Sequence, residues 1–199
     1  MAFAELLGHP DVVEELELRS AVGLLALHGG LEPGTAEIAF EVATRAHASC
    51  YTISQPRDLR VHIPSVDADP QQMPRLAAFL RHVETVVSIH GYYRPLEQPQ
   101  AVLVGGANRS LVTPLATRLR AALPDYVVVD DIEAIPSHMR GLDPRNPVNL
   151  ATQGGVQLEL PHHLRMVRHS RFDRESALHQ RHTEVLLRTI VEFVHTLPA

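Results

Sequence analysis

Apolar residues along this 199-residue chain gather in short runs whose spacing alternates between strand-like and helix-like. Continuous apolar runs predict buried strands at Ala21–Leu27, Thr85–Ile89 and Ala101–Val104. Alternating apolar and polar residues predict a further strand at Val156–Leu160. Shorter segments of strand-like composition predict three more, at Cys50–Ser54, Leu59–Ile63 and Tyr126–Val129.

Helices are predicted between these strands by apolar residues three and four positions apart. Thr35 is the expected N-cap of the first helix, which runs from Ala36 to about Ala48. Pro, Gly and Asn are frequent from Pro136 to Gly155, which predicts a long loop. The other predicted helical segments are Pro74–His82, Ser110–Leu123 with Pro114 in its first turn, Leu164–Arg168, and Asp173 to Thr196.

This order of elements predicts an α/β fold, a three-layer sandwich in which helices cover both faces of a mixed, mostly parallel central sheet. No repeat, low-complexity block or linker divides residues 1–199, so we expect a single domain. Ligands of such sheets collect at the carboxyl ends of the strands. Two predicted strands end in His-Gly, at His28 and His90, which makes this edge the expected site.

Composition and charge narrow the classes of function. The net charge of −5 argues against general nucleic-acid binding. The arginine- and histidine-rich stretch His162–Arg188 is either a solvated helix face or a surface for an anionic polymer. No signal segment and no apolar run long enough for a bilayer occur, so we expect a cytoplasmic protein without membrane association. Cys50 has no partner for an internal disulfide and is expected to be a buried apolar residue.

The segment His28-Gly29-Gly30-Leu31-Glu32 combines residue types that bind zinc with a turn that allows close approach. Zinc takes nitrogen and oxygen ligands in a tetrahedral array, and glycines let the backbone fold back around an ion. A Gly-rich turn with a hydrogen-bonded histidine is the structural alternative. If the strand before His90 lies in the same sheet, both imidazoles meet at one edge. Two histidines and one glutamate leave a fourth position open for water, as in catalytic zinc sites.

Gln157 and Glu159 share one face of the strand Val156–Leu160, whose other face is apolar. A glutamate in an otherwise buried strand needs a partner, because an unpaired buried carboxylate is costly. Beside a zinc-bound water, Glu159 would take a proton and later pass it to the leaving amine. A strand end that faces solvent is the alternative.

The ordered motifs together resemble those of a known family, the zinc-dependent poly-γ-glutamate hydrolases of phages and bacteria. They are His-Gly-Gly, Glu-Pro-Gly-Thr, Val-Ser-Ile-His-Gly, Val-Gly-Gly-x-Asn and Gly-Val-Gln-Leu-Glu-Leu, and they extend from about Leu24 to Arg165. The resemblance implies a fold similar to zinc carboxypeptidases and endo-type cleavage of γ-glutamyl amide bonds. It also implies one Zn²⁺ ion held by His28, Glu32 and His90.

The same resemblance implies that Glu159 is the catalytic carboxylate. Glu37, in the Gly-Thr-x-Glu segment, is expected either to support the site from outside the ligand shell or to lie at the N-terminus of a helix, because zinc-bound imidazoles usually need a hydrogen-bonded partner. Gln157 is also expected to support the site from outside the ligand shell.

Arginines that follow the motif loops are the candidates for binding substrate carboxylates. Arg94 and Arg109 follow two of these loops, and Arg165 follows the strand of Glu159. Each guanidinium can make a two-pronged contact with a carboxylate, and each can equally be a surface arginine. Asn108 is a loop residue that is expected to line the substrate site.

Three functions are compatible with these residues. The leading hypothesis is a zinc-dependent hydrolase of γ-linked polyglutamate or a related γ-glutamyl amide. The second keeps the zinc chemistry but acts as an amidohydrolase or deacylase of small acylated amino acids or peptides. The third is a non-catalytic protein that binds an anionic polymer. The expected partner is an acidic amide or polyamide, without nucleic acid or membrane. The sequence does not fix the oligomeric state, and a monomer is the expectation.

Overall fold

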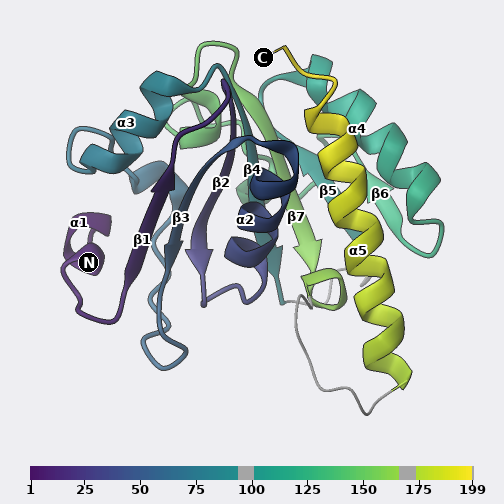
Figure 1. Ribbon diagram of the computed structural model, residues 1–199, viewed down its shortest axis with the longest axis horizontal. Coiled ribbons are helices and arrows are strands. Elements are labelled where there is room, and N and C mark those ends of the chain that lie inside the picture. The colour runs from purple at the N-terminus through teal and green to yellow at the C-terminus, as the bar shows by residue number, and fades with distance from the viewer. Residues whose placement is uncertain (94–100, 166–173, 199) are drawn as a thin grey trace.

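A computed structural model describes residues 1–93, 101–165 and 174–198 of the chain. They contain one seven-stranded sheet with the strand order β1-β3-β2-β4-β7-β5-β6 (Figure 1). The strands are β1 Val13–Glu17, β2 Val22–Gly29, β3 Ser49–Ser54, β4 Thr85–Tyr92, β5 Ala101–Gly105, β6 Val127–Val129 and β7 Gly155–Pro161. The α-helices are α1 Phe3–Leu7, α2 Thr35–Ala46, α3 Pro74–His82, α4 Arg109–Ala122 and α5 Arg174–Val194.

The sheet is mixed and mostly parallel, as predicted. Strands β3, β2, β4 and β7 run parallel to one another, and β5 runs parallel to β6. Antiparallel pairing occurs between β1 and β3 and between β5 and β7. The carboxyl ends of β2, β4 and β7 therefore meet at one edge of the sheet, whereas β5 ends at the opposite edge.

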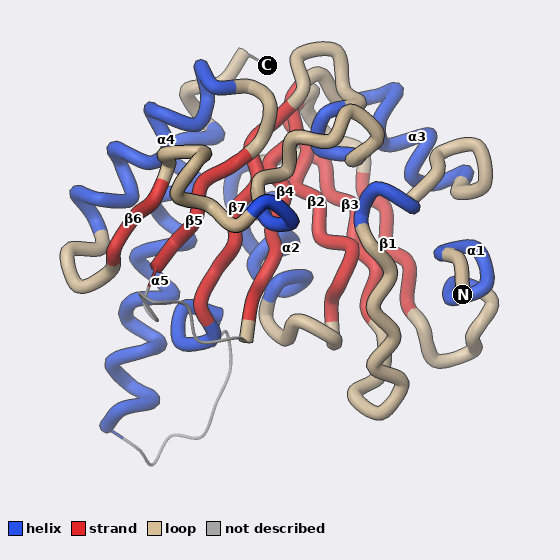
Figure 2. Tube along the Cα trace, turned by 180° about the vertical axis from the view of Figure 1, so that it is seen from behind, coloured by secondary structure: helices blue, strands red, loops and turns tan. Residues whose placement is uncertain are grey.

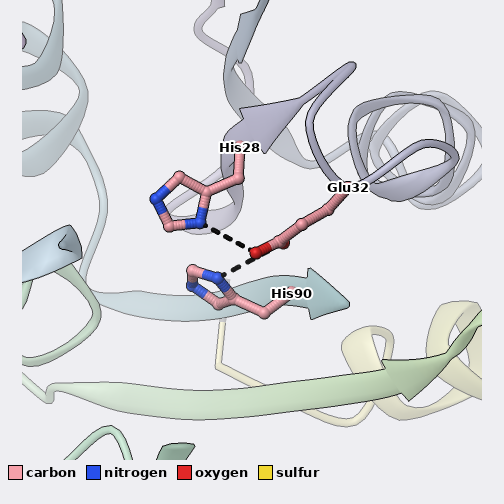
Figure 3. Close-up of side chains that lie close together, drawn as sticks. All are labelled: His28, Glu32 and His90. Carbon is pink, nitrogen blue, oxygen red and sulfur yellow. Dashed lines mark ion pairs between the residues drawn. The ribbon is translucent and has the colours of Figure 1, made fainter. Parts of the chain in front are cut away.

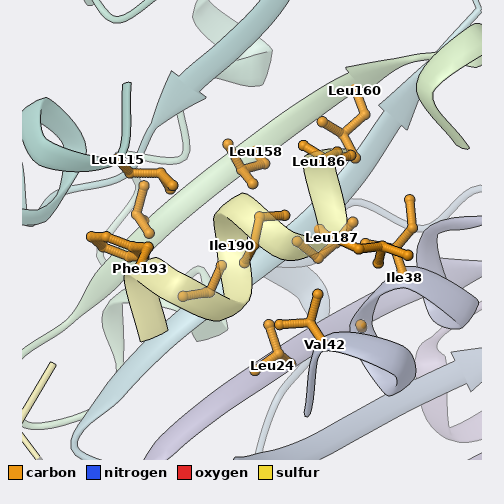
Figure 4. Packing of buried hydrophobic residues seen from close by; sticks show 14 of the residues in the cluster. Leu24, Ile38, Val42, Leu115, Leu158, Leu160, Leu186, Leu187, Ile190 and Phe193 are labelled. Carbon is orange, nitrogen blue, oxygen red and sulfur yellow. The ribbon is translucent and has the colours of Figure 1, made fainter. Parts of the chain in front are cut away.

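Helices cover both faces of this sheet, so the predicted three-layer arrangement is confirmed. On one face, α2, α4 and α5 pack over a large apolar core that includes Leu24, Val42, Leu158 and Ile190 (Figure 4). On the other face, α1, α3 and the loops seen in Figure 2 enclose a second, smaller core. That core includes Leu25, Tyr51, Met73, Phe79 and Val86.

Most predicted elements are present, and the differences have local causes. The predicted strand Leu59–Ile63 is a loop, because β3 is already paired on both of its edges by β1 and β2. Thr35 is the first residue of α2 and not its N-cap, since its hydroxyl donates to the Glu32 carbonyl and the left-handed Gly34 occupies the cap position. Pro114 lies inside α4, beyond its first turn. The 3₁₀ turn His162–Arg165 is described, and the rest of the predicted segment Leu164–Arg168 lies outside the described residues.

Two further observations complete the fold. Helix α1 and strand β1 were not predicted, because α1 has only five residues and β1 is a largely acidic, partly exposed edge strand. Within the described ranges, no helix is both long and apolar enough to cross a membrane.

Candidate metal centre

A β-bulge near the end of β2 turns His28 toward the second core. From Ala26 to Gly29, β2 advances three residues while the paired β3 advances two, from Thr52 to Ser54. A bulge of this kind re-aims one side chain relative to simple alternation. Leu27 and His28 consequently both lie on the face that carries α1 and α3, where the His28 ring stacks 6.4 Å from the ring of Phe3.

The turn that follows the bulge depends on two glycines. Gly30 and Gly34 both have positive φ, at 79° and 94°, which side-chain-bearing residues rarely adopt. A Cβ atom on Gly30 would lie 1.8 Å from the Gln55 carbonyl oxygen, and one on Gly34 would lie 1.9 Å from the Arg165 carbonyl oxygen. This close backbone approach lets the chain return Glu32 to the side of His28.

Three side chains converge at the carboxyl edge of the sheet: His28 from β2, Glu32 from the turn and His90 from β4 (Figure 3). His28 Nδ1 lies 3.1 Å from Glu32 Oε1, and His90 Nδ1 lies 3.7 Å from Glu32 Oε2. One ligand atom from each residue lies within 4.8 Å of the others. All three side chains are largely buried, which is unusual for a glutamate without a counter-charge.

The cluster fits a metal ion better than it fits a hydrogen-bonded network. Buried ring nitrogens of both histidines, His28 Nδ1 and His90 Nε2, have no hydrogen-bond partner within the described residues. His28 Nδ1 is close to the Glu32 carboxylate but lacks hydrogen-bond geometry. The ligand atoms of two residues that bind one zinc ion at a tetrahedral angle lie roughly 3.3 Å from each other. The observed separations of 3.1 and 3.7 Å bracket that spacing.

Charge in the cluster is balanced between the carboxylate and the imidazoles. Burial alone would raise the pKa of Glu32, but the adjacent imidazoles of His28 and His90 together hold that pKa well below its usual range. Burial likewise opposes protonation of His28, yet the adjacent Glu32 raises the pKa of that imidazole. The site is therefore built around an ionised carboxylate that attracts positive charge.

Backbone groups fix the ligand side chains from outside. The other nitrogen of His28, Nε2, lies 2.9 Å from the Ile63 carbonyl oxygen. Because a carbonyl oxygen can only accept, Nε2 carries the proton, and Nδ1 keeps the lone pair that could bind an ion. The Gly91 N–H donates to Glu32 Oε2 at 2.9 Å. Of the two expectations for Glu37, the structure matches the second, because Glu37 is exposed in the first turn of α2. The carbonyl of Ile63, not Glu37, contacts the His28 ring.

Glu159 lies beside this cluster on the next strand. In the β4–β7 ladder it is paired in register with His90, so both side chains project from the same face of the sheet. Burial is the main reason that the pKa of Glu159 is raised well above its usual value, and the nearby Glu32 charge adds to the effect. A buried carboxyl group with a raised pKa beside such a cluster has the properties of a proton-transfer group.

A chain of side-chain amides holds the Glu159 carboxyl group. Asn146 Oδ1 accepts a hydrogen bond from the Val148 N–H, so its Nδ2 donates to Gln157 Oε1 at 3.2 Å. Gln157 Nε2 in turn donates to Glu159 Oε1 at 3.0 Å and to the Met139 carbonyl. One backbone N–H thus sets the orientation of both amides. Gln157, which the sequence predicted as a supporting residue, thus contacts Glu159, whereas Asn146 was not predicted.

Arg165 lies close to the site but is buried. Its guanidinium donates to the carbonyls of Pro33, Tyr92 and Leu160, at 2.8, 3.1 and 3.2 Å. These carbonyls belong to the Glu32 turn and to the ends of β4 and β7, so Arg165 ties together the three segments that carry the site. The substrate contact predicted for Arg165 has no support in these contacts.

Asn108 and Arg109 are at the wrong edge of the sheet for the predicted substrate contacts. Because β5 is antiparallel to β7, the loop after β5 lies beside the beginning of β7. The Asn108 N–H donates to the Gly155 carbonyl, and Arg109 donates to the Asp130 carbonyl. Arg94, the remaining candidate, lies outside the described residues.

One residue near the cluster was missed in the sequence. The His62 ring lies 5.1 Å from the His28 ring, at the exposed margin of the site. The segment Val61–Ile63 contained a signal, a polar residue between two apolar ones, but this alternation led instead to the incorrect strand prediction.

The layered mixed sheet with its convergent His-Glu-His cluster has the metallo-carboxypeptidase-like fold. A metallo-carboxypeptidase from Burkholderia cenocepacia has a TM-score of 0.50 and 13% sequence identity, over 98% of this chain and 69% of that one. The family model of poly-gamma-glutamate hydrolase matches residues 4–194, and the chain therefore belongs to this family. The resemblance found in the sequence is confirmed.

Two further solved structures share the fold over nearly the whole chain. The zinc-free apo form of YNDL has a TM-score of 0.76 and 25% identity, covering 98% of this chain and 96% of that one. A bacteriophage poly-gamma-glutamate hydrolase has a TM-score of 0.67 and 20% identity, covering 94% and 91%. A comparison with curated protein sequences found no significant match.

Proposed function

We propose that this protein is a zinc-dependent hydrolase that cleaves the γ-linked amide bonds of polyglutamate or a related γ-glutamyl substrate. The observation that carries the proposal is the convergence of His28, Glu32 and His90 beside Glu159, at the edge of the sheet where such folds bind ligands. Membership of the poly-gamma-glutamate hydrolase family supports the substrate class. The similar structure described as zinc-free supports zinc as the ion.

In this proposal His28, Glu32 and His90 would hold the ion through two imidazoles and one carboxylate. A bound zinc ion supplies Lewis-acid polarisation of the amide carbonyl and makes water more acidic. Glu159 accepts the proton of the attacking water and transfers it to the amide nitrogen as the C–N bond breaks. The products are a carboxylate and a free amine, and Glu159 returns to its ionised state.

The surrounding residues act by holding these groups in place. Gln157 and Asn146 fix one oxygen of Glu159. Arg165 holds the Glu32 turn against the ends of β4 and β7. Small displacements of catalytic groups are costly in rate, so we assign positioning roles to these three side chains.

The proposal is tested by metal analysis together with substrate cleavage. We expect near-stoichiometric zinc in the purified protein and little in His90→Ala, because loss of one of three ligands removes an essential part of the site. His195→Ala, a change at an exposed histidine beyond the end of α5, is the matched control and is expected to retain zinc. The parent and the control are expected to reduce the viscosity of a poly-γ-glutamate solution, and His90→Ala is not.

Other outcomes would identify a different function. Equal zinc in the parent and His90→Ala would remove His90 from the site. Cleavage of small acylated amino acids without cleavage of the polymer would indicate an amidohydrolase or deacylase. Salt-sensitive binding of the polymer with neither metal nor turnover would indicate a non-catalytic binding protein.

A further inference from the structure

His62 is a fourth histidine at the candidate metal centre, and the proposed chemistry does not use it. Its ring centroid lies 5.1 Å from that of His28, and its side chain is exposed whereas those of His28 and His90 are buried. It does not belong to the three-residue cluster whose ligand atoms lie within 4.8 Å of one another. His62 therefore borders the ion site on its solvent side.

The position of His62 is fixed by contacts on both sides of it in the chain. Val61 makes two hydrogen bonds with the side chain of Gln55, from its N–H at 2.7 Å and to its carbonyl at 2.8 Å. Gln55 is itself buried, and its N–H donates to the Gly29 carbonyl next to His28. On the other side, the Ile63 carbonyl lies 2.9 Å from His28 Nε2. The segment is thus attached twice to the strand end that carries His28.

The His62 ring itself is not used in these contacts. Neither of its ring nitrogens has a hydrogen-bond partner in residues 1–93, 101–165 and 174–198. A positioned, solvent-facing imidazole beside a reaction site can donate an N–H to an anionic ligand. The arginines that the sequence proposed for this role are committed elsewhere or lie at the opposite edge of the sheet, apart from Arg94, which is outside the described residues.

We propose that His62 is a substrate-contacting specificity residue that donates a ring N–H to the free carboxylate next to the scissile amide. The inference rests on the proposed function, because γ-linked glutamate presents one free α-carboxylate on every residue. The exposed Arg57, Asp58 and Arg60 lie on the same loop as His62. The loop between β3 and the 3₁₀ turn Ser65–Asp67 is then the element that recognises the substrate's carboxylates.

The test compares two short γ-glutamyl oligomers, one with free α-carboxylates and one in which they are amidated. Zinc content, kcat and KM are measured for the parent, His62→Ala, His62→Gln and the control His195→Ala. We expect His62→Ala to keep its zinc, to change kcat by less than about threefold and to raise KM for the free-acid oligomer about ten- to a hundredfold. KM for the amidated oligomer is expected to change little, and His62→Gln, which keeps an N–H donor, is expected to recover part of the loss.

Each remaining result would overturn the inference. An equal rise in KM for both oligomers would mean that His62 supports the local structure only. Loss of zinc in His62→Ala would make it part of the ion site. If the parent cleaves the polymer and His62→Ala keeps both the KM and the preference for the free acid, the inference about His62 is wrong and the proposed function stands. If the zinc-loaded parent cleaves no γ-glutamyl substrate, the proposed function fails and this inference falls with it.

Discussion

The two faces of β7 differ in what they carry, although their residues alternate along one strand. Val156, Leu158 and Leu160 point into the large core under α4 and α5. Gln157 and Glu159 point to the other face, where Glu159 is in register with His90. Both sets are buried, so burial alone does not separate structural from chemical positions.

The two faces of β7 differ in what their buried side chains need from their neighbours. The leucine face needs only close packing, because apolar side chains gain free energy from leaving water. The Gln157 and Glu159 face buries polar atoms, and each therefore requires a partner, which the amide chain from Asn146 supplies in part. Ring nitrogens of His28 and His90 that have no hydrogen-bond partner among the described residues also lie on this second face, and they are the atoms that the proposed ion would contact.

Substitution of Glu159 by glutamine is expected to give the largest effect on activity. Glu159→Gln keeps the shape of the side chain but removes the group that transfers the proton, so kcat is expected to fall about 10²- to 10⁴-fold. Zinc content is expected to stay at the parent level, since Glu159 is not one of the three proposed ligands. Steady-state hydrolysis and elemental analysis of the same preparation measure the two quantities.

Leu158→Ala, at the neighbouring residue on the opposite face of β7, is the control for this prediction. If Glu159→Gln keeps full activity, the proton is transferred by a different group. If it loses zinc, Glu159 belongs to the ion site.

Leu158→Ala is expected to reverse this pattern. Removing a buried leucine from a close-packed core lowers the free energy of unfolding by about 2–5 kcal/mol. Turnover per folded molecule is expected to stay within about twofold, because the change lies on the face away from the ion. Urea unfolding followed by circular dichroism measures the stability, and assays well below the unfolding midpoint measure the activity. A loss of kcat without a loss of stability would show that the two faces are coupled.

The sequence predicted the three layers and the principal strands because their apolar patterns are strong. The continuous run in β4 and the alternation in β7 each predict a strand, and both strands are buried along their whole length. The cluster of His28, Glu32 and His90 was expected from two His-Gly strand ends, and its assignment as a ligand set remains a prediction that the geometry supports.

Other features depend on contacts that no local pattern contains. The β2 bulge that turns His28 is visible only in the pairing with β3. The Leu59–Ile63 segment has strand-like alternation, yet both edges of the preceding strand, β3, are already paired with β1 and β2. The direction of β5 likewise cannot be deduced from its apolar residues, and this direction decides the edge at which Asn108 and Arg109 lie.

Arg109→Ala tests the comparison between the two edges of the sheet and is expected to have the smallest effect. Arg109 is exposed and donates to the Asp130 carbonyl, at the edge opposite the carboxyl ends of β4 and β7. KM and kcat for poly-γ-glutamate are therefore expected to stay within about twofold of the parent, and the free energy of unfolding within ~0.5 kcal/mol, as for most surface substitutions. Assayed beside His62→Ala, the variant distinguishes a local substrate contact from a general effect of positive charge on a polyanion. A rise in KM for Arg109→Ala as large as that for His62→Ala would show that the polymer is bound across both edges.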